Sequence, residues 1–275
     1  MTDMTAGSPR NGTENERDGP RRIKSVCTAA TVIDVIKQQQ GGSLTDISQE
    51  LELTKGTVHT YLQTLVDCGF VTRENGEYRL SFQFIALGEH VRNETDLYMA
   101  GHSEVDALAE RTGEYAHLIG EERGRETVLY ESRGEFAVAM DYHLRMRETP
   151  QHLHDTAAGK AILAHVPTDR RDEIIANQEF ERQTANTITD AAELRETLAD
   201  IRERGYAVND EEEIRGMRAV GAPVLGPDET VVGAVSVTAP TSRLKDERFR
   251  TEMPEQVMET ANLIEVNLET ARFDS

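Results

Sequence analysis

One short stretch of the chain carries side chains suited to contact with nucleic acid. Within residues 54–67, Val58, Leu62 and Leu65 recur at helical spacing and predict a helix with one apolar face. The opposite face offers hydroxyls, an amide, a lysine and a histidine, and no carboxylate before Asp67. Such groups donate to and accept from base edges and phosphates. The predicted DNA contacts are Lys55, Gly56, Thr57, His59 and Thr60 on this helix, Thr45 on the helix before it, and Arg73 and Arg79 after it.

The neighbouring elements would hold this helix in place. Apolar residues within 44–51 share one face of a shorter helix, and Thr54 then stands where an N-cap belongs. Gly69 suits a left-handed C-terminal cap, and two short alternating runs follow, joined by Asn-Gly at 75–76, a strong hairpin signal. Two short helices, a tight turn and a hairpin predict a winged helix-turn-helix over residues 21–82.

A winged helix also serves as a protein-docking module, because a fold does not determine a function. The alternative is therefore a metabolite sensor or enzyme whose N-terminal domain only docks proteins. The outward face of the second helix favours DNA, since its groups suit base edges and phosphates. A gel shift against genomic fragments separates the two, because a docking module would show no preferred site.

Length and composition limit the remaining possibilities. The 275 residues are enough for two separate cores, and the chain has no run of eighteen apolar residues that would predict a membrane span. Residues 1–20 lack the apolar core of a signal peptide and are rich in Gly, Pro, Asn and charge, which predicts a disordered tail. Cys27 and Cys68 are expected as reduced, packed thiols in a cytoplasmic protein.

The net charge of −20 is unevenly distributed along the chain. Residues 21–85 carry seven basic and seven acidic side chains, whereas residues 86–275 carry 21 basic against 39 acidic ones. Lysine is scarce, with five among the thirty basic residues. An acid-rich, lysine-poor chain is typical of proteins from salt-accumulating halophiles, so we expect this protein to work in molar salt, where the Debye length is about 3 Å.

The remainder of the chain predicts an α+β domain. Residues 23–39 form the first helix of the winged domain, and helical periodicity then runs with little interruption from Ser81 to Arg111. That long helix connects to a second domain and could pair with its copy in another subunit, or it could be buried in its own domain. From Tyr115 the period changes to two, which predicts strands of an antiparallel sheet. The strands are expected at 115–122, 126–133, 136–142, 206–210, 218–226 and 230–240, with helices from 156 to 167, 168 to 176, 189 to 205 and 245 to 270.

Several motifs resemble phosphate-binding, metal-binding or catalytic sites but are incomplete. Gly159-Lys160 does not complete a phosphate loop, because His154 stands where the first glycine belongs and Ala161 where Ser or Thr belongs. His152 and His154 are a weak metal pair without a third partner, and neither cysteine has the spacing of a zinc ligand. The acidic run at 209–213 is most simply a solvated turn. No nucleophile, base and acid come together, so neither an enzyme, a cofactor nor a metal is expected.

A small-molecule binding site is expected in the second half of the chain. Ala157 and Ala158 leave backbone amides uncovered at a helix start, which is a ready site for a carboxylate, although small residues there also permit close packing on a sheet. Ser236 and Thr238 alternate on one side of an otherwise apolar strand, so they must find partners in a ligand or in neighbouring backbone. Asn209, at a strand end, could face the same ligand.

These stretches together resemble the IclR family of transcriptional regulators. The resemblance covers residue 23 to the end and rests on ordered motifs: SVCTAATVIDVI, LTDISQELELTKGTVHTYLQTLVDCGFV, LHDTAAGKAILAHVP, TANTITDAAELRETLADIRERGYAVNDEE, GMRAVGAPV and VVGAVSVTAP. It implies a winged helix-turn-helix over 21–82, a linker helix over 83–110 and a GAF-like effector-binding domain with an antiparallel sheet over 111–275, assembled as a homodimer or homotetramer.

The resemblance also implies a function and a pocket. Family members bind double-stranded operator DNA upstream of catabolic genes, and a small carboxylate or aromatic metabolite changes that binding. The family's effector pocket carries over onto Ala157, Ala158, Asn209, Ala219, Ser236 and Thr238. Asn209 stands where an Asp is common and Ala219 where a Cys is common, while Thr60 replaces a frequent Arg and Gly56 a frequent Ser. Each dimer is then expected to place its two recognition helices in major grooves one turn or a few turns apart, on a pseudo-palindrome.

Overall fold

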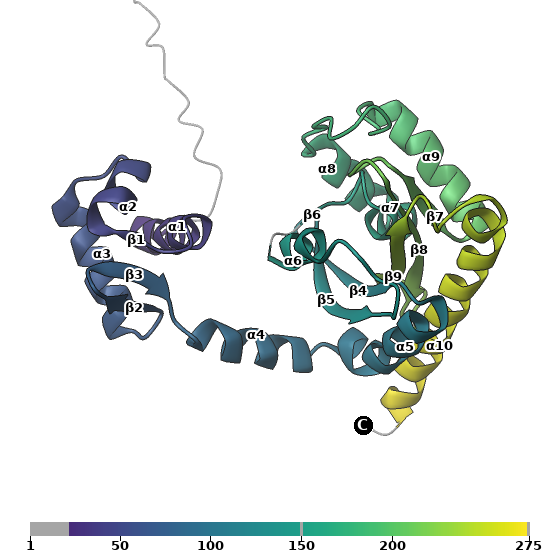
Figure 1. The fold of residues 1–275 in the computed structure, drawn as a ribbon, viewed down its shortest axis with the longest axis horizontal. Helices are drawn as coiled ribbons and strands as arrows, with labels where there is room; N and C mark the ends of the chain where they lie inside the picture. Colours follow the sequence, from purple (N-terminus) through teal and green to yellow (C-terminus); the bar gives the residue numbers. More distant parts are fainter. Residues whose placement is uncertain (1–21, 149–150, 274–275) are drawn as a thin grey trace, which may run out of the picture. The chain divides into compact units, whose positions relative to one another are not determined.

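The computed structural model describes residues 22–148 and 151–273, which fall into two compact units divided between Gly88 and Glu89 (Figure 1). The tail expected over residues 1–20 lies outside the described residues. Among the described residues, no helix is both long and apolar enough to cross a bilayer. The two units have separate hydrophobic cores and are described in turn.

The first unit is the predicted winged helix-turn-helix. Its three helices surround a core built from Val32, Ile36, Ile47, Val58 and Leu62, each fully buried. The strands pair antiparallel in the order β1-β3-β2. The elements are α1 (Lys24–Gln38), β1 (Gly42–Ser43), α2 (Leu44–Glu50), α3 (Lys55–Asp67), β2 (Val71–Glu74) and β3 (Glu77–Leu80).

Local chemistry explains where these elements begin and turn. The side chains of Ser43 and Asp46 form a capping box at the start of α2, in which each satisfies the other's backbone amide. Thr54 caps α3, as predicted, by accepting a hydrogen bond from the amide of Thr57 at 3.2 Å. The wing turns at Asn75 and Gly76, whose φ angles of 52° and 86° are those a tight hairpin requires.

The long helix expected from Ser81 to Arg111 is two helices, so the prediction of continuity was wrong. The structure has α4 (Gln83–Asn93) and α5 (Asp96–Thr112), separated at residues 94–95. The two differ in burial: α4 has no buried residue, whereas α5 packs into the core of the second unit. The reading of a helix buried in its own domain therefore holds for α5, whereas the pairing of the helix with a second subunit stays a prediction.

The second unit is built on a six-stranded antiparallel sheet in the order β6-β5-β4-β9-β8-β7. Helices α5 and α10 cover one face, and α7 and α9 cover the other (Figure 1). The strands are β4 (Tyr115–Glu122), β5 (Arg125–Arg133), β6 (Gln151–His152), β7 (Ala207–Asp210), β8 (Met217–Leu225) and β9 (Val231–Pro240). The remaining helices are α6 (Met140–Glu148), α7 (Ala157–His165), α8 (Thr168–Ala176), α9 (Ala191–Arg204) and α10 (Met253–Phe273), the last preceded by a π-helical turn at Arg248–Glu252.

Several sequence predictions need correction. The alternating run 136–142 is not a strand: Phe136 and Val138 are exposed, Ala139 adopts a left-handed φ of 66°, and α6 begins at Met140. Its alternation therefore did not reflect a buried face. The helix expected from residue 189 begins at Ala191, and its N-cap is Asp190.

The thiols also differ from expectation. Cys27 and Cys68 are free but exposed, not packed, because they occupy the outer side of α1 and the C-cap of α3.

Candidate functional site

The outward face of α3 is a continuous polar surface. Val58 and Leu62 are fully buried beneath it, while Lys55, Thr57 and His59 point to solvent. This division follows directly from the 3.6-residue period of the helix. All the predicted contacts on α3 are exposed, so none would need to be uncovered before meeting a duplex.

Hydrogen bonds fix part of this surface in advance. The Lys55 ammonium donates to the Thr45 hydroxyl at 3.0 Å, which brings the predicted contact on α2 beside the start of α3. The Thr60 hydroxyl donates to the Gly56 carbonyl at 3.0 Å, so its hydrogen atom is committed to its own helix. The Thr57 hydroxyl lies 2.9 Å from the Thr54 hydroxyl and shares a hydrogen bond with it, whereas the His59 ring points to solvent.

The two predicted wing residues are held in different ways. Arg73 lies over the Tyr78 ring, with its guanidinium carbon 5.4 Å from the ring centre. Arg79 donates to the Gln40 carbonyl at 3.1 Å and pairs with Glu77 at 2.8 Å. That pair is exposed and therefore weak, so a phosphate could replace the carboxylate.

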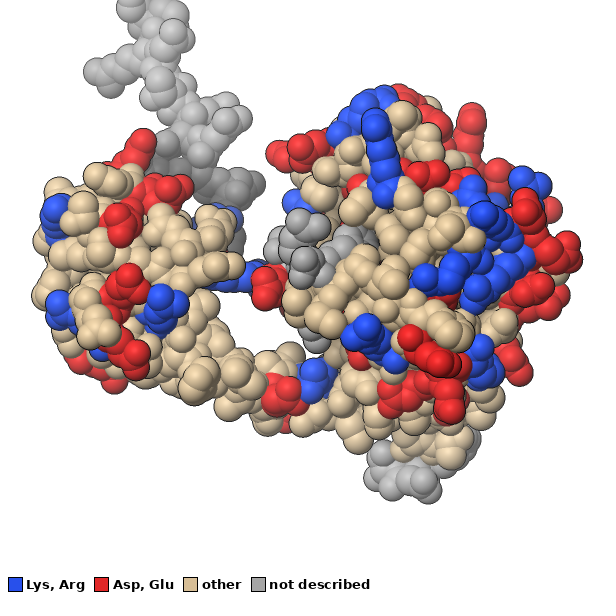
Figure 2. All heavy atoms as spheres, in the orientation of Figure 1, with Lys and Arg blue, Asp and Glu red and all other residues tan. Residues whose placement is uncertain are grey.

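Charges are distributed differently on the two units. On the face drawn in Figure 2 the first unit is mostly uncharged, with scattered charges of both signs, while the second unit carries dense acidic and basic groups. This matches the count along the sequence, in which the acidic excess begins after residue 85. The acidic excess therefore belongs to the second unit, whereas α3 belongs to the first.

In the second unit, the predicted effector residues meet at one cavity. Strand register places Asn209, Ala219 and Thr238 in one row across β7, β8 and β9, and Ser236 lies in a neighbouring row. Side chains at directly opposed positions share a face of the sheet, so all four point to the side covered by α7. The cavity is lined by these four, by Ala157 and Ala158, and by Ile119, Glu126, Met146, Thr156, Glu213, Ile214, Met217 and Arg218.

The N-terminus of α7 lies directly against the sheet at this cavity. A Cβ at Gly221 would come within 2.9 Å of the backbone of Ala157 and Ala158, so only glycine permits the approach. Thr156 caps the helix by accepting from the Gly159 amide at 2.9 Å. Ala157 and Ala158, in the first turn of α7, line the cavity.

Polar groups on the sheet complete the lining. Ser236 and Thr238 are 6% and 5% exposed, and among the described residues neither hydroxyl has a hydrogen-bond partner. Asn209 differs, because its amide nitrogen donates to the Asp155 carbonyl at 2.9 Å and its oxygen accepts from the Glu212 amide at 2.8 Å. Asn209 therefore positions the cavity wall, while the two hydroxyls are available to a ligand.

Sequence reasoning missed Glu126, which comes from β5. It is buried, its Oε2 accepts from the Thr156 hydroxyl at 2.6 Å, and its Oε1 has no hydrogen-bond partner. Burial raises the pKa of Glu126 to about 8, and the hydrogen bond from Thr156 opposes this rise. The group is protonated at neutral pH and places a hydrogen-bond donor at the cavity. No local signal marked it, because Glu126 stands in a polar strand end.

The cavity is small, about 20 Å³, which is room for one or two water molecules. An aromatic acid therefore enters only if a wall moves. One wall is supplied by Met146 of α6, a flexible side chain suited to such adjustment.

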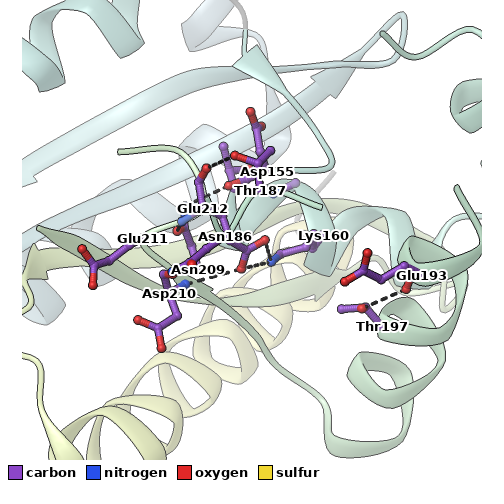
Figure 3. Close-up of polar contacts among 12 residues, drawn as sticks. Asp155, Lys160, Asn186, Thr187, Glu193, Thr197, Asn209, Asp210, Glu211 and Glu212 are labelled. Carbon is purple, nitrogen blue, oxygen red and sulfur yellow. Dashed lines mark hydrogen bonds and ion pairs between the residues drawn. The ribbon is translucent and has the colours of Figure 1, made fainter. Parts of the chain in front are cut away.

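A buried ion pair connects α7 to the loop after β7, next to the cavity. Lys160 of α7 is 1% exposed and hydrogen-bonds both carboxylate oxygens of Glu212 (Figure 3). Burial lowers the pKa of the Lys160 ammonium, and Glu212 opposes that effect. Thr187 donates to the Glu212 carbonyl at 2.6 Å, which fixes the loop after β7. Part of the acidic run at 209–213 is thus buried, and the prediction of a purely solvated turn was wrong.

The two histidines considered as a weak metal pair, His152 and His154, lie in different surroundings. His154 is fully buried against the Phe180 ring, and burial lowers its pKa to about 4. His152 instead lies against Gln178 and Arg125. Within the described residues no third ligand joins these two rings.

A winged helix-turn-helix with an exposed recognition helix, carried on the same chain as a sheet domain, defines a class of DNA-binding transcriptional regulators. Family models agree: one described as "IclR helix-turn-helix domain" matches residues 25–75, and one described as "Bacterial transcriptional regulator IclR C-terminal" matches residues 89–266. The chain belongs to the IclR family of transcriptional regulators.

The chain is also similar in sequence to individual regulators of this family. The chain is similar to the "Probable HTH-type transcriptional regulator ArcR" of Halobacterium salinarum, with 51% identity over 92% of this chain and 96% of that protein. It is 32% identical to the regulator XynR of Escherichia coli, over 82% of this chain and 89% of XynR.

The crystal structure of the Thermotoga maritima IclR has a TM-score of 0.71 at 28% identity, over 89% of this chain and 98% of that one. An IclR homolog from Microbacterium hydrocarbonoxydans, solved in complex with 4-hydroxybenzoate, has a TM-score of 0.76 at 20% identity, over 90% and 99% of the two chains. That second likeness shows the shared fold alone.

Proposed function

We propose that this regulator binds a pseudo-palindromic operator in the cytoplasm and that a small carboxylate or aromatic metabolite controls the binding. One observation carries the proposal. The same chain has an exposed polar recognition helix and a cavity lined by the buried hydroxyls of Ser236 and Thr238 and by Glu126, whose Oε1 atom has no hydrogen-bond partner. A ligand changes DNA affinity only as far as it prefers one arrangement of the DNA-binding heads, so the two features must be coupled.

For the DNA contacts, we propose that Thr57 and His59 read base edges. Both are exposed on α3, whereas the Thr60 hydroxyl is committed to its own helix. Lys55 with Thr45, and Arg73 with Arg79 on the wing, are proposed to contact the phosphate backbone, where they position the helix without reading sequence. Gly56 lets the backbone approach the duplex closely.

For the effector, we propose that its carboxylate meets the amides of Ala157 and Ala158, with Ser236 and Thr238 donating from the sheet. A helix N-terminus carries partial positive charge and free amides, which suits an anion. Protonated Glu126 supplies a further donor beside Thr156. An aromatic acid such as the 4-hydroxybenzoate bound by the Microbacterium homolog is one candidate of this chemistry.

Exposed apolar residues support assembly as a homodimer or homotetramer. Phe82, Ile85 and Val91, on and beside α4, are 86%, 61% and 65% exposed, and Ile23 and Val26 at the start of α1 are similarly open. Large apolar side chains gathered on a helix face are typical of a protein interface. A dimer would bring two copies of α3 to the two half-sites of a palindrome.

We also propose that the protein works in molar salt. The second unit carries a strong acidic excess, and the relative ArcR belongs to a Halobacterium. Such salt screens self-repulsion, since the Debye length is then about 3 Å. It also weakens phosphate contacts, so base readout carries more of the affinity.

The test is operator selection from genomic fragments followed by titration in molar KCl. Changing Thr57→Ala or His59→Ala should weaken binding to the selected operator about tenfold or more, because each removes a base contact worth about 1–3 kcal/mol. Affinity for random DNA should change little. Thr270→Ala, an exposed threonine on α10, is the matched control. Wild-type operator affinity in both α3 variants would refute the DNA assignment.

The same titration tests the effector. Aromatic and aliphatic carboxylic acids are added to the protein–operator complex, and the change in affinity is recorded. Thr238→Val keeps the shape of the side chain but removes the hydroxyl, so it should abolish the response while leaving binding without ligand intact. A variant that responds like the wild type would remove Thr238 from the effector site.

A further inference from the structure

Three metal-ligating side chains converge at a point that neither the recognition helix nor the effector contacts use. His117 of β4 and Glu131 of β5 are direct cross-strand partners, and His143 comes from α6. The His117 Nε2 atom lies 3.1 Å from His143 Nδ1 and 3.4 Å from Glu131 Oε2. The third side, from His143 Nδ1 to Glu131 Oε2, measures 3.8 Å.

The cluster is enclosed. The side chains of both histidines are 1% exposed and that of Glu131 is 10% exposed. His117 has a second ring nitrogen, Nδ1, that is buried without a hydrogen-bond partner. The His143 ring is in turn packed on Tyr115, with the ring centres 3.6 Å apart. The rings are thus held in place by packing, as ligands of a preformed site are.

The three distances fit a tetrahedral ion. Zinc bonds to histidine nitrogen and carboxylate oxygen at about 2.0–2.2 Å, so two ligand atoms of a tetrahedral site lie about 3.3–3.5 Å apart. The observed sides of 3.1, 3.4 and 3.8 Å bracket that separation. An octahedral ion of the same bond lengths would need sides of about 3.0 Å, which fits less well. Two histidines and a glutamate are a known ligand set for zinc with one open position.

We propose that His117, Glu131 and His143 bind a Zn²⁺ ion, with water in the fourth position. The ion replaces the proton shared between the two facing ring nitrogens and neutralises part of the enclosed carboxylate charge. It joins three successive elements of the chain: two strands of the sheet and α6. The proposal does not depend on operator binding or on the identity of the effector.

The site also bears on the shape of the cavity. His117 lies directly opposite Ser236 of β9, so the ion would sit on the cavity face of the sheet. Met146, which lines the cavity, follows His143 by three residues on α6 and so lies on the same side of that helix. The ion therefore fastens α6 where that helix walls the cavity.

The test uses metal-free full-length protein in molar KCl. Co²⁺ is added first, because its visible absorption distinguishes tetrahedral from octahedral coordination, and Zn²⁺ is then titrated as the competitor. We expect one Co²⁺ per chain with a tetrahedral spectrum, displaced by Zn²⁺. Hydrogen exchange of residues 140–148 should slow when Zn²⁺ is bound, because α6 is then tied to the sheet.

Matched variants separate ligation from folding. Glu131→Gln removes the charged ligand and His143→Gln removes an imidazole ligand, and both variants keep a side chain of similar volume. Each should weaken Zn²⁺ binding by more than about 100-fold, because loss of a direct ligand costs more than loss of an outer-shell partner. His165→Gln, which changes a half-buried histidine bonded to the Ala161 carbonyl, should bind as the wild type does. Circular dichroism of each variant confirms its fold.

Two results would overturn the proposal. One is the absence of stoichiometric Co²⁺ and Zn²⁺ binding by the wild-type protein. The other is binding that survives in both Glu131→Gln and His143→Gln, which would place the ion elsewhere.

Discussion

The two units of this regulator treat polar side chains in opposite ways. In the first unit the functional groups lie on the surface, and Ser48 is its single buried polar residue within the described part of the chain. In the second unit the functional groups are enclosed, including Lys160, Glu126, His117 and Glu212. The first unit has exposed polar side chains, which suit a large partner such as DNA. The second unit has buried polar side chains, which suit a small ligand.

This contrast has an energetic consequence. An exposed polar group keeps its water, so its removal changes recognition but little stability. A buried polar group has lost its water and depends on its partner, so removal of the partner leaves an unmet desolvation cost. We expect mutations in the first unit to separate binding from folding and mutations in the second to affect both.

The sharpest test of the contrast compares two lysines. Lys160→Met leaves Glu212 buried without its partner, so the free energy of unfolding should fall by about 3–5 kcal/mol. Lys55→Met, on the exposed face of α3, should change it by less than about 0.5 kcal/mol. Denaturant unfolding in molar KCl measures both.

The double variant Lys160→Met with Glu212→Leu is the control, because an apolar pair of similar size recovers most of the loss. Equal stability of the two lysine variants would break the comparison.

A second test compares two threonine caps. Thr54 is an exposed cap of α3, and Thr54→Ala should cost about 1 kcal/mol. Thr156 caps α7 and also donates to buried Glu126, so Thr156→Ala should cost about 2–3 kcal/mol. Thermal unfolding of the two variants gives the difference. A smaller loss of stability in Thr156→Ala than in Thr54→Ala would contradict the prediction that a buried cap contributes more than an exposed one.

A third test is a pH dependence with opposite signs in the two units. The folded state keeps Glu126 protonated to about pH 8, against an ordinary pKa of 4.5, so it binds more protons than the unfolded state between these values. Stability from this group therefore falls as pH rises through that window, by at most about 1.4 kcal/mol per pH unit. In the first unit, hydrogen bonds from Ser43 lower the pKa of Asp46, so its contribution is present above pH 3.8 and is lost in acid.

Unfolding is measured from pH 5 to 8 for the wild type and for Glu126→Gln, which keeps the hydrogen bond from Thr156. The difference between the two curves isolates Glu126 from the other titrating groups, His154 among them. Parallel curves would show that Glu126 is not held protonated.

Much of the first unit was predictable because its elements are specified locally. The cap at Thr54, the apolar positions of α3 and the Asn-Gly wing turn each depend on residues within a few positions of one another. The same holds in the second unit for α7, for the end of α9 at Gly205 and for the strands of the sheet. The predicted strand at 136–142 failed because its large apolar residues, Phe136, Val138 and Met140, are exposed, so alternation there carried no information about burial.

The sequence by itself determined the winged helix, the polar face of α3 and the presence of an antiparallel sheet with amides uncovered at the start of α7. Only the tertiary structure decided which buried groups meet. Lys160 and Glu212 are 52 residues apart, and His117, Glu131 and His143 come from two strands and a helix. The physical reason is that periodicity reports which side of an element faces inward, whereas strand register and helix packing decide what that side touches.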